Sequence, residues 1–144
     1  MNFENNSSHI DRYEEKILEI LSVDGRIPVT ELAKQIGISK SPCQARLKRL
    51  IDNKIILGFR AVLNAKLLNQ EHIAFTKVKL SDTRETALLA FNDAVGKIPE
   101  IEQCHMIAGS FDYLLKVRST DIRTYRRILG ETISALPHVA NTST

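Results

Sequence analysis

The sequence predicts an α+β protein in which a winged helix-turn-helix module precedes a ferredoxin-like βαββαβ module. Apolar residues recur with helical spacing from Ile10 to Asn53, whereas alternating, β-rich segments dominate from Ile73 onward. The segment from Lys34 to Lys66 carries eight basic residues against one acidic residue, a net charge of +7. The segment from Leu67 to Thr144 is neutral, with nine basic and nine acidic residues. This contrast indicates two modules, one of which meets a polyanion, although a merely solvated basic face also fits the charge alone.

Length and composition limit the classes of protein to consider. The chain has 144 residues, of which 43% are hydrophobic and 26% charged, so two small domains fit but a (β/α)₈ barrel of about 250 residues does not. No apolar run approaches the roughly 18 residues of a membrane span. Residues 1–9 lack a basic region before an apolar core, so we expect a short disordered leader, no secretory signal and, by default, a cytoplasmic location.

The first module is expected over residues 10–63 and begins with two short helices. A helical stripe starts at Asp11 and ends at Asp24-Gly25. Pro28 then breaks the chain. Thr30 is expected to cap a second helix, which Gly37 ends in a left-handed conformation.

The third helix is predicted to read DNA. Ser41 is expected to cap it, with Pro42 at its first position, and the helix runs to about Asn53. Its apolar face carries Cys43, Leu47, Leu50 and Ile51, and its other face Gln44, Arg46, Lys48 and Arg49. A tight turn containing glycine before a basic helix is typical of a helix-turn-helix, although ordinary helical hairpins share the turn.

A helix fits the major groove of DNA, where the residues at its N-terminal end meet base edges. We therefore expect base contacts from Ser39, Lys40, Ser41, Gln44 and Ala45, and phosphate contacts from Arg46, Lys48 and Arg49. The segment from Ile55 to Leu63 is predicted to form two short strands that turn near Gly58. Such a hairpin would be the wing, and from it Arg60 would reach a phosphate.

A polar linker over residues 64–72 leads to the second module, residues 73–144. Its predicted elements are strands over Ile73–Leu80, Ile101–Ala108 and Tyr113–Arg118, helices over Thr86–Val95 and from Asp121 to Pro137, and an extended segment over Ala140–Thr144. This order is the ferredoxin-like arrangement. Two helices cover one face of such a sheet, and the other face carries either Phe75 or Val78 and either Cys104 or His105, so we expect dimers that stack these faces.

Two motifs in this order resemble the Lrp/AsnC (feast/famine) regulators. The first runs from Asp11 through Asp24-Gly25-Arg26, Glu31-Leu32-Ala33, Gly37-Ile38-Ser39, Pro42-Cys43 and Lys48-Arg49-Leu50 to Gly58-Phe59. The second is Cys104-His105-Met106-Ile107-Ala108-Gly109-Ser110-Phe111-Asp112-Tyr113-Leu114-Leu115, closed by Leu136-Pro137, Val139 and Thr142. The resemblance covers nearly the whole chain from Asp11 and is strongest to the leucine-responsive and proline-utilisation type.

The resemblance implies a transcription factor that binds double-stranded DNA, dimerises through its second domain and assembles further, often as an octamer. It also implies that a small amino acid (leucine, proline or similar) binds between sensing domains and changes assembly or DNA geometry. Members of the family usually continue past the position of Thr144, so we expect a short last strand.

The resemblance places the amino acid at the strand and turn from His105 to Tyr113. The expected contacts are His105, Met106, Ala108, Gly109, Ser110, Phe111, Asp112 and Tyr113. Backbone N–H groups around Gly109 would bind the carboxylate, Asp112 the ammonium, and Met106 or Phe111 the side chain. The alternative is a plain tight turn in which Asp112 bonds its own backbone.

Catalytic, metal and cofactor sites are not expected. The four histidines form no HExxH motif, and the glycines form no GxGxxG or Walker A loop. Cys104 and His105 are neighbours on a strand, so they cannot hold one metal ion together, and His105 is expected to be packed or interfacial. Two alternatives stay open: an enzyme resembling sirohaem decarboxylases, which a tetrapyrrole colour would reveal, and an amino-acid sensor that does not bind DNA.

Overall fold

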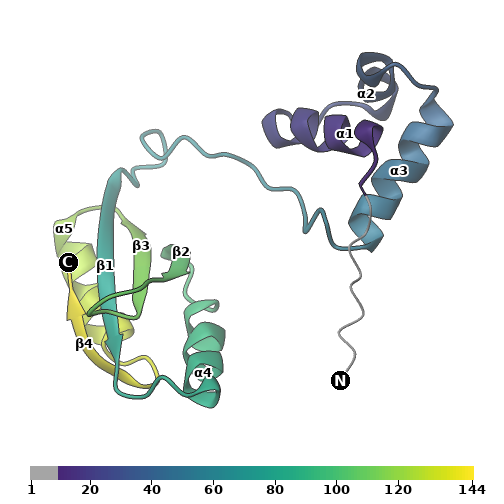
Figure 1. The fold of residues 1–144 in the computed structure, drawn as a ribbon. Helices are drawn as coiled ribbons and strands as arrows, with labels where there is room; N and C mark the ends of the chain where they lie inside the picture. The colour runs from purple at the N-terminus through teal and green to yellow at the C-terminus, as the bar shows by residue number, and fades with distance from the viewer. Residues whose placement is uncertain (1–9) are drawn as a thin grey trace, which may run out of the picture. The chain divides into compact units, whose positions relative to one another are not determined.

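The computed structural model describes residues 10–144, and this part of the chain divides into two compact units between Val62 and Leu63 (Figure 1). The first unit holds three helices. The second holds a four-stranded sheet with helices on one face, so the predicted α+β class is confirmed. The expected leader over residues 1–9 lies outside the described residues.

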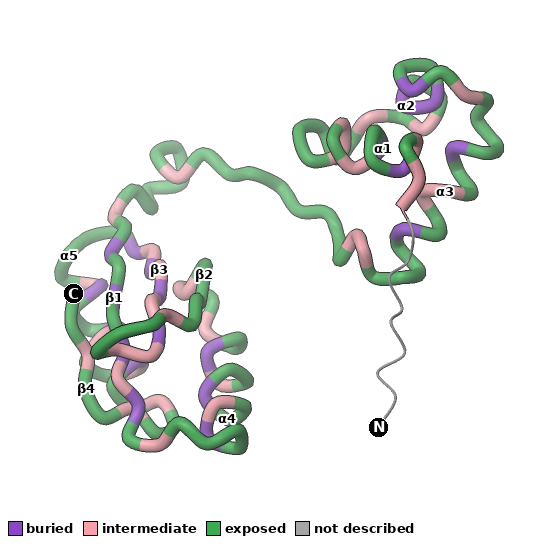
Figure 2. The backbone as a smooth tube through the Cα atoms, viewed as in Figure 1, coloured by how far each residue is buried: buried purple, intermediate pink, exposed green. Residues whose placement is uncertain are grey.

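The first unit packs α1 (Arg12–Val23), α2 (Val29–Ile36) and α3 (Lys40–Asp52) around one small core. The buried side chains of this core are Ile17, Leu32, Ala33, Ile36, Cys43 and Leu50. Cys43 and Leu50 thus lie on the inner face of α3, as their spacing predicts, whereas Ile51 is 38% exposed. The opposite face of α3 is therefore left open to solvent along most of its length (Figure 2).

The chain turns between these helices where the sequence predicts, but two helices begin earlier. Gly37 adopts φ 80° and ends α2, with its N–H bonded to the Ala33 carbonyl oxygen at 3.0 Å. The expected cap at Thr30 is wrong because α2 already begins at Val29, after Pro28. The expected cap at Ser41 is also wrong. Ser39 is the N-cap, so Pro42 lies third in the first turn, where its missing N–H breaks no helical hydrogen bond.

The predicted β-hairpin wing is absent, since the structure assigns no strand between α3 and His72. Ile55 and Ile56 turn back onto α3 and donate their N–H groups to the Leu50 carbonyl at 3.0 and 3.1 Å. Beyond them the chain is irregular, and Leu57 and Val62 are 89% and 100% exposed. A lone hairpin is marginal in water, and burial of Leu57 and Val62 does not stabilise one here.

The second unit is a sheet in the order β2-β3-β1-β4, with every neighbouring pair antiparallel. Its strands are β1 (His72–Leu80), β2 (Ile101–Met106), β3 (Tyr113–Ser119) and β4 (Val139–Ser143), and its helices are α4 (Glu85–Val95), α5 (Ile122–Arg127) and the π-helix η1 (Ile128–Ile133). This is the predicted βαββαβ order. The core lies between the helices and the inward residues of β1 and β3, among them Val78, Leu115 and Val117.

The π-helix alters which residues of the last helical segment are buried. Ile128 is buried, whereas Leu129 is only partly buried against the core, and Ile122, which precedes η1, is 52% exposed. A π-helical turn inserts one extra residue, which rotates the following side chains about the helix axis. Tyr125 and Ile133 are both buried.

The other face of the sheet is not covered by any described segment of this unit. Burial alternates along β1 and β3 (Figure 2). The register places Ile73, Phe75 and Leu114 on the outward face. Of the two choices that the sequence left open, the register sets Phe75 and His105 on this uncovered face and Val78 and Cys104 on the helix side.

Candidate DNA interface and ligand-binding turn

The N-terminal half of α3 presents a row of exposed side chains. The exposed residues among those predicted to touch DNA are Ser39, Lys40, Ser41, Gln44, Ala45, Lys48, Arg49 and Arg60. Lys48 forms an i,i+4 ion pair with Asp52 at 2.5 Å, and both side chains are mostly exposed. A surface pair of this kind contributes little to stability, so the Lys48 ammonium can exchange Asp52 for a phosphate at small cost. Arg60 lies in the irregular segment rather than on a wing.

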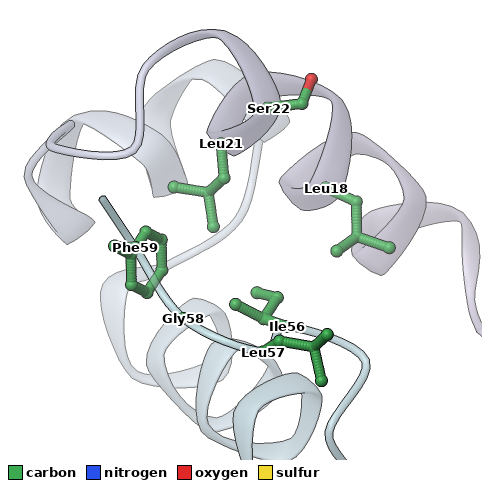
Figure 3. Close-up of a pocket in the computed structure, with 7 residues that line it drawn as sticks. All are labelled: Leu18, Leu21, Ser22, Ile56, Leu57, Gly58 and Phe59. Carbon is green, nitrogen blue, oxygen red and sulfur yellow. The ribbon is translucent and has the colours of Figure 1, made fainter. Parts of the chain in front are cut away.

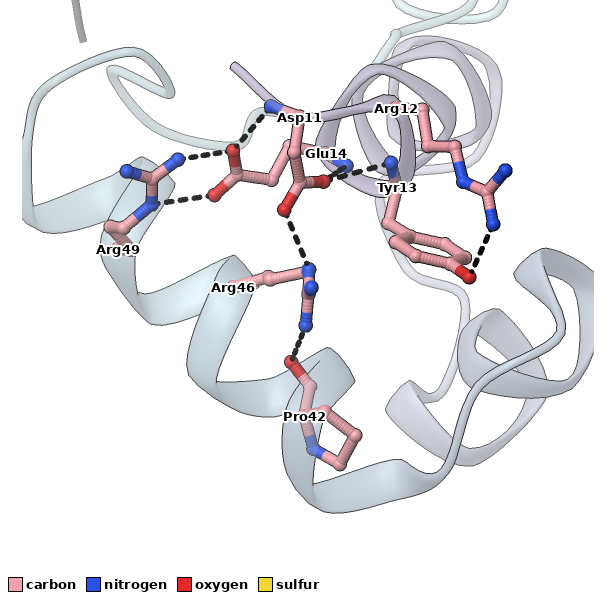
Figure 4. A network of polar contacts seen from close by, with 7 residues as sticks. All are labelled: Asp11, Arg12, Tyr13, Glu14, Pro42, Arg46 and Arg49. Carbon is pink, nitrogen blue, oxygen red and sulfur yellow. Dashed lines mark hydrogen bonds and ion pairs between the residues drawn. The ribbon is translucent and has the colours of Figure 1, made fainter. Parts of the chain in front are cut away.

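Arg49 belongs to this exposed row and Arg46 is half-buried beside it, but the guanidinium groups of both are bound by carboxylates at the start of α1. The Arg46 Nε donates to Asp11 Oδ2 at 3.1 Å, and the Arg49 Nε donates to Glu14 Oε1 at 2.6 Å (Figure 4). A second nitrogen of Arg49 binds the other oxygen of Glu14, which makes this pair bidentate. Both guanidinium groups are therefore held at the N-terminus of α1.

Asp11 and Glu14 form the capping box of α1, which explains why they are placed to meet α3. The Asp11 side chain accepts the N–H groups of Tyr13 and Glu14 at 2.8 and 2.9 Å, and the Glu14 side chain accepts the Asp11 N–H at 3.0 Å. The Arg46 guanidinium also lies 5.2 Å from the centre of the Tyr13 ring. The D-x-x-E spacing of this capping box was visible in the sequence, but its second role as a pair of arginine acceptors was not.

Burial makes the Glu14–Arg49 pair different from a surface ion pair. The Glu14 side chain is 0% exposed, whereas the Arg49 side chain is 45% exposed. The hydrogen bonds from Arg49 outweigh the effect of burial and hold the pKa of Glu14 below 4.5. The carboxylate is therefore charged at neutral pH and depends on its partners, because an enclosed charge without them is strongly destabilising.

The turn between β2 and β3 holds the predicted ligand residues, and Asp112 is its best-connected member. The Asp112 Oδ2 accepts the Leu80 N–H at 2.7 Å, and its Oδ1 accepts from the Lys79 ammonium at 3.2 Å. Its own N–H donates to the Val78 carbonyl at 2.9 Å. The Asp112 side chain and N–H therefore bond β1, at the point where the β1–β4 register shifts, while its carbonyl oxygen accepts the Ile107 N–H at 2.9 Å across the turn.

The other predicted ligand residues lie in differing environments. Met106 pairs with Tyr113 and His105 with Leu114 across β2 and β3, so Met106 and His105 lie on opposite faces of the sheet. Gly109 has φ 122°, which L side chains rarely adopt. Ala108, Ser110 and Phe111 complete the turn, and Phe111 has the Lys77 ammonium 5.9 Å from its ring centre.

Tyr113 contributes a polar atom that lacks a partner. Its ring packs against Phe91 at 4.6 Å, and its hydroxyl is buried without a hydrogen-bond partner among the described residues. Burial raises the pKa of this phenol above 10. A buried hydroxyl without a bond is costly, and this one lies on the helix side of the sheet, the same side as Val78.

An apolar pocket of about 220 Å³ opens in the first unit, between α1 and the segment after α3 (Figure 3). It is lined by Leu18, Leu21, Ser22, Ile56, Leu57, Gly58 and Phe59. The one hydroxyl there, on Ser22, already donates to the Glu19 carbonyl at 2.6 Å. With no charged side chain in its wall, this pocket is unsuited to a zwitterionic amino acid.

Neither a metal cluster nor a membrane span is found in the described part of the chain. Residues 10–144 contain no group of three His, Cys, Asp or Glu side chains that could hold a metal ion. Within the same residues no helix is long and apolar enough to cross a membrane.

Comparison with known proteins identifies both modules. Residues 10–56 match the winged helix-turn-helix DNA-binding family, and residues 73–144 match the Lrp/AsnC ligand binding domain. A proline dehydrogenase transcriptional activator of Rhizobium radiobacter is 66% identical over 94% of this chain and 86% of its own length. The leucine-responsive regulatory protein of Escherichia coli K12 is 42% identical over 94% of this chain and 82% of its own length.

Solved structures agree with these matches. A transcriptional regulator of Neisseria meningitidis in complex with L-Met superposes with a TM-score of 0.83 at 30% identity, covering 94% of this chain and 87% of that one. The alternative of an enzyme is set aside, because the relatives are regulators and the DNA-binding module is present. The chain therefore belongs to the Lrp/AsnC family of DNA-binding transcriptional regulators.

Proposed function

We propose that this regulator reads DNA with the exposed side of α3. The observation that carries this proposal is the row of exposed polar side chains at the N-terminal half of α3, inside a segment of net charge +7. Gln44 has the geometry to bond adenine with both its amide atoms, and Ala45 to touch a thymine methyl group. Ser39, Lys40 and Ser41 lie beside them, whereas Lys48 and Arg60 are suited to phosphates.

The gene controlled is proposed to be one for proline breakdown. The Rhizobium radiobacter relative is named for activating proline dehydrogenase, and it shares two thirds of its aligned residues with this chain. A regulator of a breakdown gene is expected to respond to the compound that is broken down. Proline is thus our first candidate for the effector and leucine the second, given the name of the Escherichia coli relative. A DNA-binding regulator acts in the compartment that holds its DNA, so we infer a cytoplasmic location.

The effector is proposed to bind at the turn from His105 to Tyr113. The L-Met complex of the Neisseria relative supports a small amino acid as ligand. Asp112 uses two acceptor positions of its carboxylate, while a carboxylate has about four, so an ammonium group can add to it.

The uncovered face of the sheet is proposed to join two subunits. Ile73 and Phe75 are 41% and 54% exposed on this face, and Leu114 lies beside them. Two copies stacked about a twofold axis would bury these side chains, as self-complementary faces do in most dimers. Assembly beyond the dimer, including an octamer, stays a prediction from the family resemblance.

Fluorescence anisotropy tests the proposal. The full chain is titrated onto DNA from upstream of the proline dehydrogenase gene of its own organism and onto a scrambled duplex, with L-proline, L-leucine or glycine present. We expect selective, salt-sensitive binding that L-proline changes and glycine does not. Equal binding to both duplexes at low salt would contradict the DNA proposal. An unchanged proline dose response in Asp112→Ala would remove Asp112 from the effector site.

A further inference from the structure

Two carboxylates of α1 meet two arginines of α3 at matching intervals. Asp11 and Glu14 are three residues apart on α1, and Arg46 and Arg49 are three residues apart on α3. This spacing is nearly one helical turn, so each pair projects from one face of its helix. Figure 4 shows both arginine side chains reaching from α3 to the start of α1. The two ion pairs, which we call the α1–α3 clasp, fix α3 at two points along its axis.

Three observations distinguish the clasp from the chance pairing of surface charges. The Glu14 carboxylate is fully enclosed and bound by both ends of the Arg49 fork. Asp11 is held in place by the backbone N–H groups of Tyr13 and Glu14, so it presents a fixed acceptor to Arg46. The Tyr13 ring lies against the Arg46 guanidinium as well. Asp11, Glu14 and Arg46 therefore each have their geometry set by a second interaction.

We infer that the clasp sets the angle at which α3 enters DNA, and that Asp11, Glu14, Arg46 and Arg49 are positioning residues. This inference rests on the proposed DNA-reading role of α3. Base contacts from Gln44 and its neighbours require a fixed tilt of the helix, because hydrogen bonds weaken steeply when their angle changes. The clasp also occupies the guanidinium fork of Arg49, which a bidentate phosphate contact would need.

Glu14→Gln tests the hold of Glu14 on Arg49 separately from its part in the capping box of α1. Glutamine at the third helical position still accepts the Asp11 N–H, so the capping box survives, but the negative charge that holds Arg49 is lost. The matched control is Glu15→Gln, which removes the same charge from the neighbouring exposed position of the same helix. Long-range electrostatics alone predicts that both variants bind DNA slightly more tightly, since each gains one unit of positive charge.

The clasp predicts that the two variants differ in DNA affinity, measured by anisotropy titration of the full chain at several salt concentrations. Glu14→Gln should bind its DNA site on the order of tenfold more weakly, and Glu15→Gln no more weakly than the unaltered chain. The slope of log K against log salt should not change in Glu14→Gln, because no phosphate contact is removed. In Lys48→Ala, by contrast, the slope of log K against log salt should become shallower by about one, because one phosphate contact is lost. Circular dichroism at the same temperature checks that each variant is folded.

Arg49→Lys provides a second, conservative test. Lysine keeps the charge for a phosphate but cannot form the fork, so the clasp predicts weaker binding in this variant with an unchanged salt slope. Equal affinity of Glu14→Gln and Glu15→Gln, both folded, would overturn the inference. So would full DNA affinity in Arg49→Lys. Absence of DNA binding by the unaltered chain at every salt concentration would instead overturn the proposed function itself.

Discussion

At the level of single residues, the surroundings of a carboxylate decide what it does. Asp112 was expected from the sequence to meet an amino-acid ligand, and in the folded chain it already bonds the backbone of Leu80 and the ammonium of Lys79. It therefore fastens the β2–β3 turn to β1 before any ligand arrives. A ligand at this position would act on a group that also holds the sheet together.

Asp112→Asn is predicted to destabilise the second unit by about 1–3 kcal/mol, because the Leu80 N–H and the Lys79 ammonium lose a charged acceptor. The measurement is a urea titration followed by NMR signals of β1 and β3. Asp93→Asn is the control, since it breaks an exposed i,i+4 pair with Lys97 and should leave the midpoint nearly unchanged. Equal midpoints for the two variants would contradict the role given to Asp112.

The first unit should lose stability in acid. The pKa of Glu14 is lowered below 4.5 in the folded chain by its hydrogen bonds to Arg49, so the stabilisation is complete above that value and is lost as pH falls through the folded pKa. Asp11, whose pKa is lowered by the Glu14 N–H, adds to the same trend. Urea midpoints of α1 amide signals should decrease from about pH 5 downward. Glu14→Gln should make the urea midpoint depend less on pH. The same pH profile in Glu14→Gln and in the unaltered chain would contradict the role of the Glu14 carboxylate in stabilising the first unit.

At the level of helices and turns, Gly37 and Gly130 both have open space around them but differ in backbone conformation. A Cβ at Gly37 or at Gly130 would meet no atom within 4 Å, but Gly37 has φ 80° and Gly130 has no positive φ. The turn between α2 and α3 therefore requires glycine, whereas η1 does not.

Gly37→Ala should destabilise the first unit by about 1–2 kcal/mol, because an L side chain is strained in the left-handed region. Gly130→Ala should stabilise the second unit by up to about 1 kcal/mol through a better helix propensity. Thermal unfolding followed by circular dichroism of both variants checks the two signs. If both variants were stabilised, or both destabilised, the positive φ of Gly37 would not be what makes glycine necessary there.

The elements that the sequence predicts well are those whose signals are local. Asp11, Gly37 and Asp121 mark helix ends through their own side chains or their lack of one, and each lies where expected. The prediction of a β-hairpin wing was wrong because strand formation depends on pairing partners. The segment from Leu57 to Val62 does not pair with another strand of its own unit.

The candidate DNA interface was predicted in part. Periodicity identified the face of α3 that carries Cys43 and Leu50, and hence the exposed row that includes Gln44. It could not show that Arg46 and Arg49 turn back to α1, because that depends on a contact 35 residues away in the chain. Long, flexible basic side chains follow their nearest carboxylate rather than the helical period.

At the level of the whole molecule, two separate cores stabilise the two units. Leu50 is enclosed in the helical core and Leu115 in the sheet core, each with 0% exposure. No residue belongs to both clusters of the described chain. The DNA-binding and ligand-binding units are therefore expected to unfold separately.

Leu50→Ala and Leu115→Ala should each cost about 2–5 kcal/mol, and each in one unit only. A urea titration of the full chain, followed by NMR signals from α2 and from β3, distinguishes the two transitions. We expect Leu50→Ala to shift only the α2 signals and Leu115→Ala only those of β3. If both signals shifted together in either variant, the units would be coupled in folding.

The most direct test of the central claim, that α3 reads DNA sequence, is the specificity of Gln44→Ala. The ratio of its affinities for the DNA upstream of the proline dehydrogenase gene and for a scrambled duplex is measured by anisotropy, beside that of the unaltered chain. The unaltered chain should prefer its own site by roughly 10³-fold or more. Gln44→Ala should lower the difference in binding free energy between the two duplexes by about 1–3 kcal/mol. Its affinity for the scrambled duplex should stay unchanged. An unchanged preference in this variant, or no preference in the unaltered chain, would contradict the assignment of α3 as the helix that reads DNA.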